Sequence, residues 1–149
     1  MNWLLYIHII AATAWIGGSI FMFALGVFLK DKEKQSIIYP EIAPIFGYFE
    51  LVSLVILLSS GTWIMYDAGM LSSLLRGDSN EILNILKTKL WMVLIIVIAT
   101  ILHFIVALKT NNAQRSQLEN LISRSSSLLV FFLNFVVVYF AMLIRTSMG

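Results

Sequence analysis

Two histidines and the residues spaced around them are the side chains of this sequence best suited to hold a cofactor. His8 and His103 are the only histidines in the chain, and a neutral imidazole binds both haem iron and copper. On an α-helix, Trp15 and Met22 share a face with His8, because they follow it by about two and four turns. This spacing predicts a slot beside Trp15 with His8 as a ligand. The alternative is a small-residue face for close helix packing, in which His8 is hydrogen-bonded to a neighbour.

The depth of each polar side chain in its apolar stretch decides which of them can meet. His8 lies near the outer end of the first stretch, whereas His103 lies towards the inner end of the third. Their levels differ by more than about 15 Å at the helical rise, so we expect that they do not share one metal ion. Candidate ligands should instead form two layers. The outer layer contains His8, Met65, Lys89, Met92 and Arg145, and the inner layer contains Met22, Glu50, His103 and Asn134.

Each of these residues also has a structural explanation. Glu50 and His103 suit a buried ion pair, because a lone charge in lipid is costly. Asn134 suits a hydrogen bond between helices, and the methionines suit ordinary packing. Lys89 is long enough to extend to the membrane interface, and Arg145 suits a charge that ends the last span. The sequence leaves both explanations open.

The elements that must position these residues are membrane spans. Hydrophobic residues make up 60% of the 149 residues and charged residues 12%, whereas about 25% is usual in soluble domains. The mean hydropathy of +0.91 agrees. A net charge of +2 does not indicate a nucleic-acid partner, and the absence of cysteine excludes thiolate ligands. We predict an all-α integral membrane protein, an antiparallel four-helix bundle in one domain (1–149), with spans at about 3–29, 45–66, 89–108 and 128–144.

The connections between the spans carry the charges that orient the chain. Pro40 and Pro44 are expected to lie at the start of the second span, and residues 81–86 to form a short amphipathic helix. The larger group of basic residues is Lys30, Lys32, Lys34, Lys109, Arg115 and Arg124, and the smaller group on the other side is Arg76, Lys87, Lys89 and Arg145. The positive-inside rule therefore places both termini outside, on the periplasmic side of a bacterial-type inner membrane.

The first span carries a family resemblance. The run from His8 through Trp15, Gly17 and Gly18 resembles the first helix of CopD (copper-resistance D) domain proteins and of the related HemJ-like protoporphyrinogen oxidases. Lys87 or Lys89, at the start of the third span, and the sequence Gly-Thr-Trp at 61–63 also fit this group. Two HemJ-type features are missing: residues 21–30 contain no proline or arginine, and no Asn-Glu-x-Pro motif is present near the last span. The resemblance therefore favours the CopD-like group.

The resemblance implies haem b or copper near the outer face, with His8 as the first candidate ligand and Lys89 and Met92 as the next. We therefore expect a small inner-membrane protein for membrane redox chemistry or copper handling. Two alternatives remain: a HemJ-like protoporphyrinogen IX oxidase, in which Lys89 or Arg145 would meet the porphyrin propionates, and a structural subunit of a larger membrane complex. Whether the chain is an enzyme is left open. Besides the bilayer, the expected partners are a quinone or redox partner and a second copy of the chain.

Overall fold

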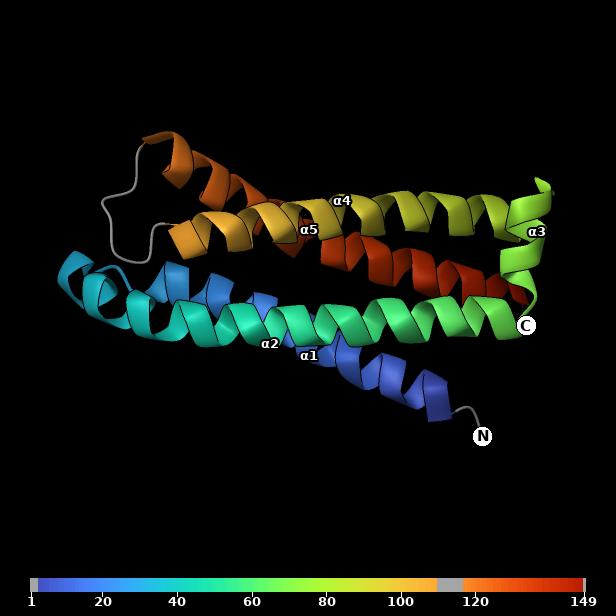
Figure 1. Ribbon diagram of the computed structural model, residues 1–149, viewed down its shortest axis with the longest axis horizontal. Helices are drawn as coiled ribbons and strands as arrows, with labels where there is room; N and C mark the ends of the chain where they lie inside the picture. The colour runs from blue at the N-terminus through green and yellow to red at the C-terminus, as the bar shows by residue number, and fades with distance from the viewer. Residues whose placement is uncertain (1–2, 110–116, 149) are drawn as a thin grey trace.

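The computed structural model of the chain describes residues 3–109 and 117–148, apart from the side chains of residues 107, 117–124, 126 and 148. Within these ranges it contains helices and no strand. The helices are α1 (Trp3–Phe28), α2 (Lys32–Asp67), α3 (Met70–Arg76), α4 (Glu81–Lys109) and α5 (Gln117–Met148), as Figure 1 shows. Of the predicted basic residues, Arg115 and the side chain of Arg124 lie outside the described part.

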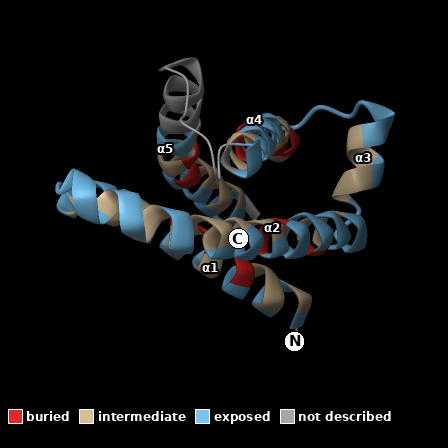
Figure 2. Ribbon diagram, turned by 60° about the vertical axis from the view of Figure 1, so that its left-hand side comes forward, coloured by how far each residue is buried: buried red, intermediate tan, exposed pale blue. Residues whose placement is uncertain are grey.

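Four of the helices are long and apolar enough to cross a membrane. The candidate spans are Trp3–Phe28, Lys32–Asp67, Glu81–Val106 and Ser127–Ser147. Large apolar side chains are exposed around these helices, and exposed residues cover most of the helix surfaces in Figure 2. Such surfaces are stable facing lipid, because a helix satisfies its own backbone hydrogen bonds there. The predicted all-helical membrane bundle is therefore confirmed, as is its contact with the bilayer. A quinone, a redox partner and a second copy remain predictions.

The helices are arranged as two antiparallel hairpins, α1 with α2 and α4 with α5, which pack more densely within each hairpin than against each other. Among the described residues, α1 also contacts α5 and α2 contacts α4, whereas the backbones of α1 and α4 do not approach each other closely. The four helices therefore follow the order α1, α2, α4, α5 around the bundle, with α1 and α4 diagonally opposite. Both chain ends lie at the end of the bundle that α3 crosses (Figure 1).

The connections differ from the prediction in two places. Helix α2 begins at Lys32, with Asp31 as its N-cap accepting a 3.0 Å hydrogen bond from the Glu33 amide, and it continues through Pro40 and Pro44. Residues 81–86 form the first turns of α4, and the separate short helix is α3. The 36 residues of α2 extend over about 54 Å, which exceeds the roughly 30 Å hydrocarbon core. Its charged first turns therefore extend into water, where a proline lacking its amide hydrogen is tolerated more easily.

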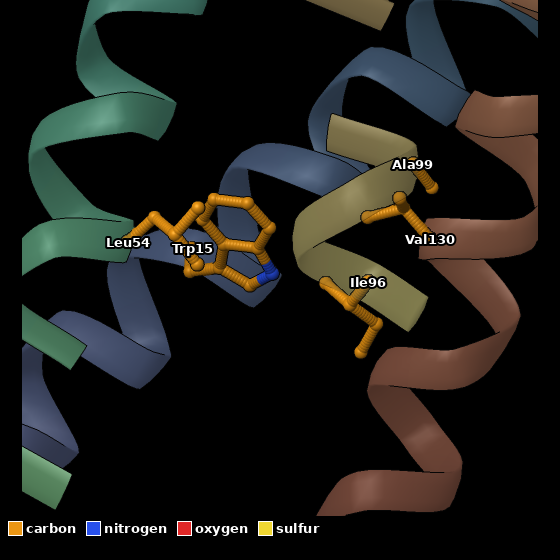
Figure 3. Close-up of a cluster of buried hydrophobic side chains, with 5 residues drawn as sticks. All are labelled: Trp15, Leu54, Ile96, Ala99 and Val130. Atoms are coloured by element: carbon orange, nitrogen blue, oxygen red, sulfur yellow. The ribbon is translucent and has the colours of Figure 1, made fainter. Parts of the chain in front are cut away.

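The core is small and contains a residue from each of the four long helices. Trp15, which is 3% exposed, lies between Leu54 on one side and Ile96, Ala99 and Val130 on the other (Figure 3). Further along the bundle, the rings of Phe23 and Phe131 stack with centroids 4.3 Å apart and so join α1 to α5. The core therefore joins the two hairpins near the middle of their length.

Candidate functional site

His8 is held against α2 by a hydrogen bond that fixes its tautomer. Its Nδ1 lies 2.8 Å from the Ser60 hydroxyl oxygen. The same hydroxyl lies 2.6 Å from the Ile56 carbonyl oxygen, which can only accept. Since a serine has one hydroxyl hydrogen, Ser60 donates it to Ile56 and accepts from Nδ1–H of His8. Nδ1–H of His8 is therefore occupied by α2.

Gly61 allows this close approach. A Cβ atom at position 61 would lie 3.1 Å from Cε1 of His8, which is closer than most real contacts. The imidazole therefore packs on the backbone of α2, beside the buried Ser60. The sequence did not predict that Ser60 pairs with His8, because the rotation of α1 relative to α2 is set by packing.

Lys89 is the second member of the site. It is half-buried on α4. On α2, a Cβ atom at Gly47 would meet Phe104 and one at Gly61, 14 residues further on, would meet His8. Because α2 and α4 are antiparallel, Lys89 lies at about the level of Gly61 and His8, on the helix diagonally opposite α1. Lys89 has no hydrogen-bond or ion-pair partner within the described part of the chain. His8 and Lys89 therefore lie at a similar level of the bundle, and their joint role as ligands stays a prediction.

The other residues predicted for the outer layer have less defined surroundings. Met92 is half-buried one turn beyond Lys89 on α4, and Arg145 is exposed near the end of α5. Lys87, the alternative to Lys89, reaches back to the preceding connection, where its Nζ donates to the Asp78 carbonyl at 3.2 Å. Lys89, unlike Lys87, therefore has no partner in the preceding connection.

Trp15 belongs to a hydrogen-bonded network in the core. Its Nε1–H donates to Oδ1 of Asn134 at 2.9 Å, and Nδ2 of Asn134 donates to the Ser19 hydroxyl at 3.2 Å. Asn134 is 4% exposed, so all three groups are satisfied inside the protein. Asn134 thereby links α5 to α1. Trp15 fills the centre of the bundle, where the sequence suggested the side of a cofactor slot.

The residues predicted as metal ligands are spread along the bundle. Met22, Glu50 and His103 are half-buried on three different helices. His8 would meet a Cβ atom at Gly61, whereas Phe104, the neighbour of His103, would meet one at Gly47, and these two positions of α2 are 14 residues or about 21 Å apart. Within the described residues, Glu50 has no hydrogen-bond or ion-pair partner, and no three His, Asp or Glu side chains are close enough to hold a metal ion. The two histidines are therefore at separate levels, as the rise per residue predicted.

A separate cleft lies on the outer side of α2, where α3 turns back over it. Its volume is about 540 Å³, and its lining is Leu58, Ser59, Thr62, Trp63, Tyr66 and Leu71. The hydroxyls of Ser59 and Thr62 both donate to backbone carbonyls one turn earlier, at 2.7 Å. The cleft therefore presents mainly apolar surface, with two aromatic rings near the end of the span.

Comparison with known proteins points to a function that the sequence analysis did not consider. Residues 42–147 match the sequence model of the family described as Phosphoethanolamine transferase EptA/EptB. The chain belongs to this family. The match covers more than two thirds of the chain and includes α2 from residue 42 onwards, all of α3 and α4, and nearly all of α5. No curated protein matches the chain, and no solved structure matches it. Membership of this family and the four spans make it a multi-pass protein of the inner membrane.

The match corrects the resemblance and the function drawn from the first span. Similarity to CopD-domain and HemJ-like proteins was wrong, and with it the expected haem or copper function and oxidoreductase class. Protoporphyrinogen oxidation and a structural-subunit role receive no support either. The run on which the resemblance mainly rested, His8 to Gly18, lies outside the matched region. Its aromatic and small residues serve helix packing: Trp15 fills the core, and Gly18 makes room for Phe46, which would lie 2.9 Å from a Cβ atom there.

Proposed function

We propose that this chain is a membrane domain of a phosphoethanolamine transferase and that it holds the phospholipid which donates the phosphoethanolamine group. The observation that carries this proposal is the family match over residues 42–147. A transferase needs a donor that already carries phosphoethanolamine. For a domain embedded in the bilayer, a phospholipid with that head group is the donor that is present at high concentration.

The cleft between α2 and α3 has the surface that a lipid needs. Its leucines suit an acyl chain, because apolar area removed from water or head groups contributes about 25 cal/mol per Å². Trp63 and Tyr66 are 60% and 73% exposed, and such rings favour the region where acyl chains meet head groups.

Charges near the cleft match a head group that carries both a phosphate and an ammonium. Asp67 ends α2 directly before the short connection to α3, and Arg76 is the last residue of α3, at the other end of that helix. Both side chains are exposed. A guanidinium suits a phosphate, and a carboxylate suits an ammonium. The presence of both charges along this segment favours a zwitterionic phosphoethanolamine head group over one that carries only negative charge.

The test is the lipid that remains bound to the purified chain. We expect native mass spectrometry to show phosphatidylethanolamine enriched over phosphatidylglycerol relative to the membrane from which the chain was extracted. Leu71→Trp should abolish the enrichment by filling the cleft. Leu75→Trp is the matched control, because Leu75 lies on the same helix and is 81% exposed. Bound lipid with the composition of the membrane, unchanged by Leu71→Trp, would contradict the proposal.

A further inference from the structure

A second recess in the surface of the bundle lies between α4 and α5, and we call it the α4/α5 groove. Its volume is about 320 Å³, and its lining is Ile95, Ile98, Ala99, Leu102, Ser125 and Leu129. Ala99 is 5% exposed, whereas the four larger apolar residues are 44–51% exposed. The groove therefore has a small buried residue at its base and large side chains along its rim.

The divergence of α4 and α5 explains the groove. Ala99 and Val130 belong to one buried cluster, so the two helices are in contact at that point. From there towards the end of the bundle opposite α3, the ribbons of the two helices move apart in Figure 1. Ser125 and Leu129, the residues that α5 contributes to the groove, both precede Val130 and so lie on the diverging side.

The groove opens to the hydrocarbon core of the bilayer. Ile95 and Leu102 mark its extent on α4, and both lie within the candidate span Glu81–Val106. Water is scarce at this depth, and a recess left empty forfeits the dispersion contacts of the side chains that line it. An apolar group from the membrane is therefore the favoured occupant.

The dimensions of the groove select an acyl chain over a helix. Ile95 and Leu102 are seven residues apart, or about 10 Å along α4. A volume of about 320 Å³ spread over that length corresponds to a channel about 6 Å wide, whereas a helix with its side chains is about 10–12 Å across. One extended hydrocarbon chain fits such a channel, and a helix of a second copy does not.

Ser125 gives the groove one polar end. This residue is exposed, and its hydroxyl has no hydrogen-bond partner within the described part of the chain. It lies two residues before Ser127, where the candidate span on α5 begins, and so is near the depth of phospholipid ester groups. A hydroxyl can donate to an ester carbonyl oxygen. Among the described residues that line the groove none is charged, so the groove favours no particular head group.

We propose that the α4/α5 groove holds one acyl chain of a phospholipid from the leaflet opposite α3, whose ester carbonyl oxygen accepts a hydrogen bond from Ser125. This lipid differs from the donor proposed for the cleft, because the cleft is formed by α2 and α3 at the other end of the bundle. Phosphoethanolamine transfer is not required for the groove to bind lipid, since shape and depth alone define the site.

The experiment places the purified full chain in vesicles of phosphatidylethanolamine and phosphatidylglycerol. A small fraction of the phosphatidylglycerol carries a photoactivatable diazirine in one acyl chain, and peptide mass spectrometry after irradiation measures the label at each residue. Leu102 and Leu129 line the groove and are 47% and 44% exposed, whereas their neighbours Ile101 and Leu128 lie outside it and are 45% and 46% exposed. We expect at least about threefold more label at the two groove residues, because a held chain stays beside them longer than a passing lipid does.

Filling the groove tests the site itself. Leu129→Trp should abolish the excess label at Leu102, whereas Leu128→Trp, the matched control, should retain it. Ser125→Ala should lower the excess in part, because it removes the hydrogen bond but leaves the apolar channel. Should the α5 variants fail to fold, Leu102→Trp and its control Ile101→Trp provide the same comparison from α4, with the label measured at Leu129.

Each outcome decides for or against the groove. Equal label at the groove residues and at their neighbours in the wild type would indicate ordinary lipid contact only and would overturn the proposal, as would excess label that survives Leu129→Trp. Cross-links from the groove to a second copy of the chain would assign it to a dimer interface and would overturn it too. Leu71→Trp, which fills the cleft, should leave the groove label unchanged. Intact groove label in a chain without enriched phosphatidylethanolamine would contradict the proposed function alone.

Discussion

The network of Trp15, Asn134 and Ser19 should stabilise the association of the two hairpins by a measurable amount. Replacing Asn134 with leucine keeps a similar volume but leaves Nε1–H of Trp15 without its 2.9 Å acceptor. Trp15 is 3% exposed, so water cannot replace that acceptor. An unsatisfied buried donor costs about 1–3 kcal/mol, whereas hydrogen bonds between membrane helices average about 0.6 kcal/mol and reach about 1.7. We therefore expect Asn134→Leu to lower the free energy of unfolding by about 1–2 kcal/mol.

A double-mutant cycle isolates the hydrogen bond from the change in packing. Trp15→Phe removes the donor and leaves Asn134 without one partner, and the double variant removes both groups. The coupling free energy between the two positions should be about 0.6–1.7 kcal/mol, the range found for such bonds. The assay is equilibrium unfolding in mixed micelles. Phe135→Leu is the control on α5, because Phe135 is 49% exposed and adjacent to Asn134. A coupling energy of zero, with Asn134→Leu as stable as Phe135→Leu, would refute the reasoning.

Three further predictions concern packing, a buried hydroxyl and topology. Gly61→Ala should lower the midpoint of thermal unfolding, because its Cβ would lie 3.1 Å from the imidazole ring, whereas Gly17→Ala, with nothing within 4 Å of its Cβ, should not lower it. Thr100→Val should leave stability equal or raise it in the same assay, since the buried Oγ1 of Thr100 has no hydrogen-bond partner in the described structure and its loss removes a cost of about 1 kcal/mol or more; a clear loss of stability would contradict this. In intact cells, an impermeant maleimide should label Ser72→Cys but not Ser36→Cys, because the chain has no native cysteine and the positive-inside rule places α3 outside; the reverse labelling would invert the topology.

Hydropathy and the rise per residue were sufficient to predict the membrane bundle and the levels of its polar groups. Both depend on local properties: the length of an apolar run and the distance along a helix. The separation of His8 from His103 and the shared level of His8 and Lys89 followed from that arithmetic. The partner of His8 did not, because Ser60 and Gly61 are brought to it by the rotation of one helix against another. Sequence periodicity does not fix that rotation when apolar residues surround the helix.

The start of α2 and the surroundings of Trp15 and Gly18 also differ from what the local sequence pattern indicated. Pro40 and Pro44 indicated the start of a span, but the N-cap at Asp31 begins α2 earlier, outside the hydrocarbon core. Trp15 and Gly18 suggested a cofactor slot, yet they satisfy core packing and a close helix contact. The family signal extends over residues 42–147 and contains no short motif with a distinctive chemistry. The family resemblance was therefore inferred mainly from short motifs in the first helix, outside that region.

We propose above all that this chain serves phosphoethanolamine transfer, and the transfer reaction tests this proposal most directly. The measurement follows phosphatidylethanolamine labelled in its head group in inner membranes that contain or lack the protein. We predict that the label leaves the lipid and appears on an acceptor only when the protein is present, and that Leu71→Trp slows this transfer while Leu75→Trp does not. Label that stays in the lipid at the same rate with and without folded protein would contradict the account.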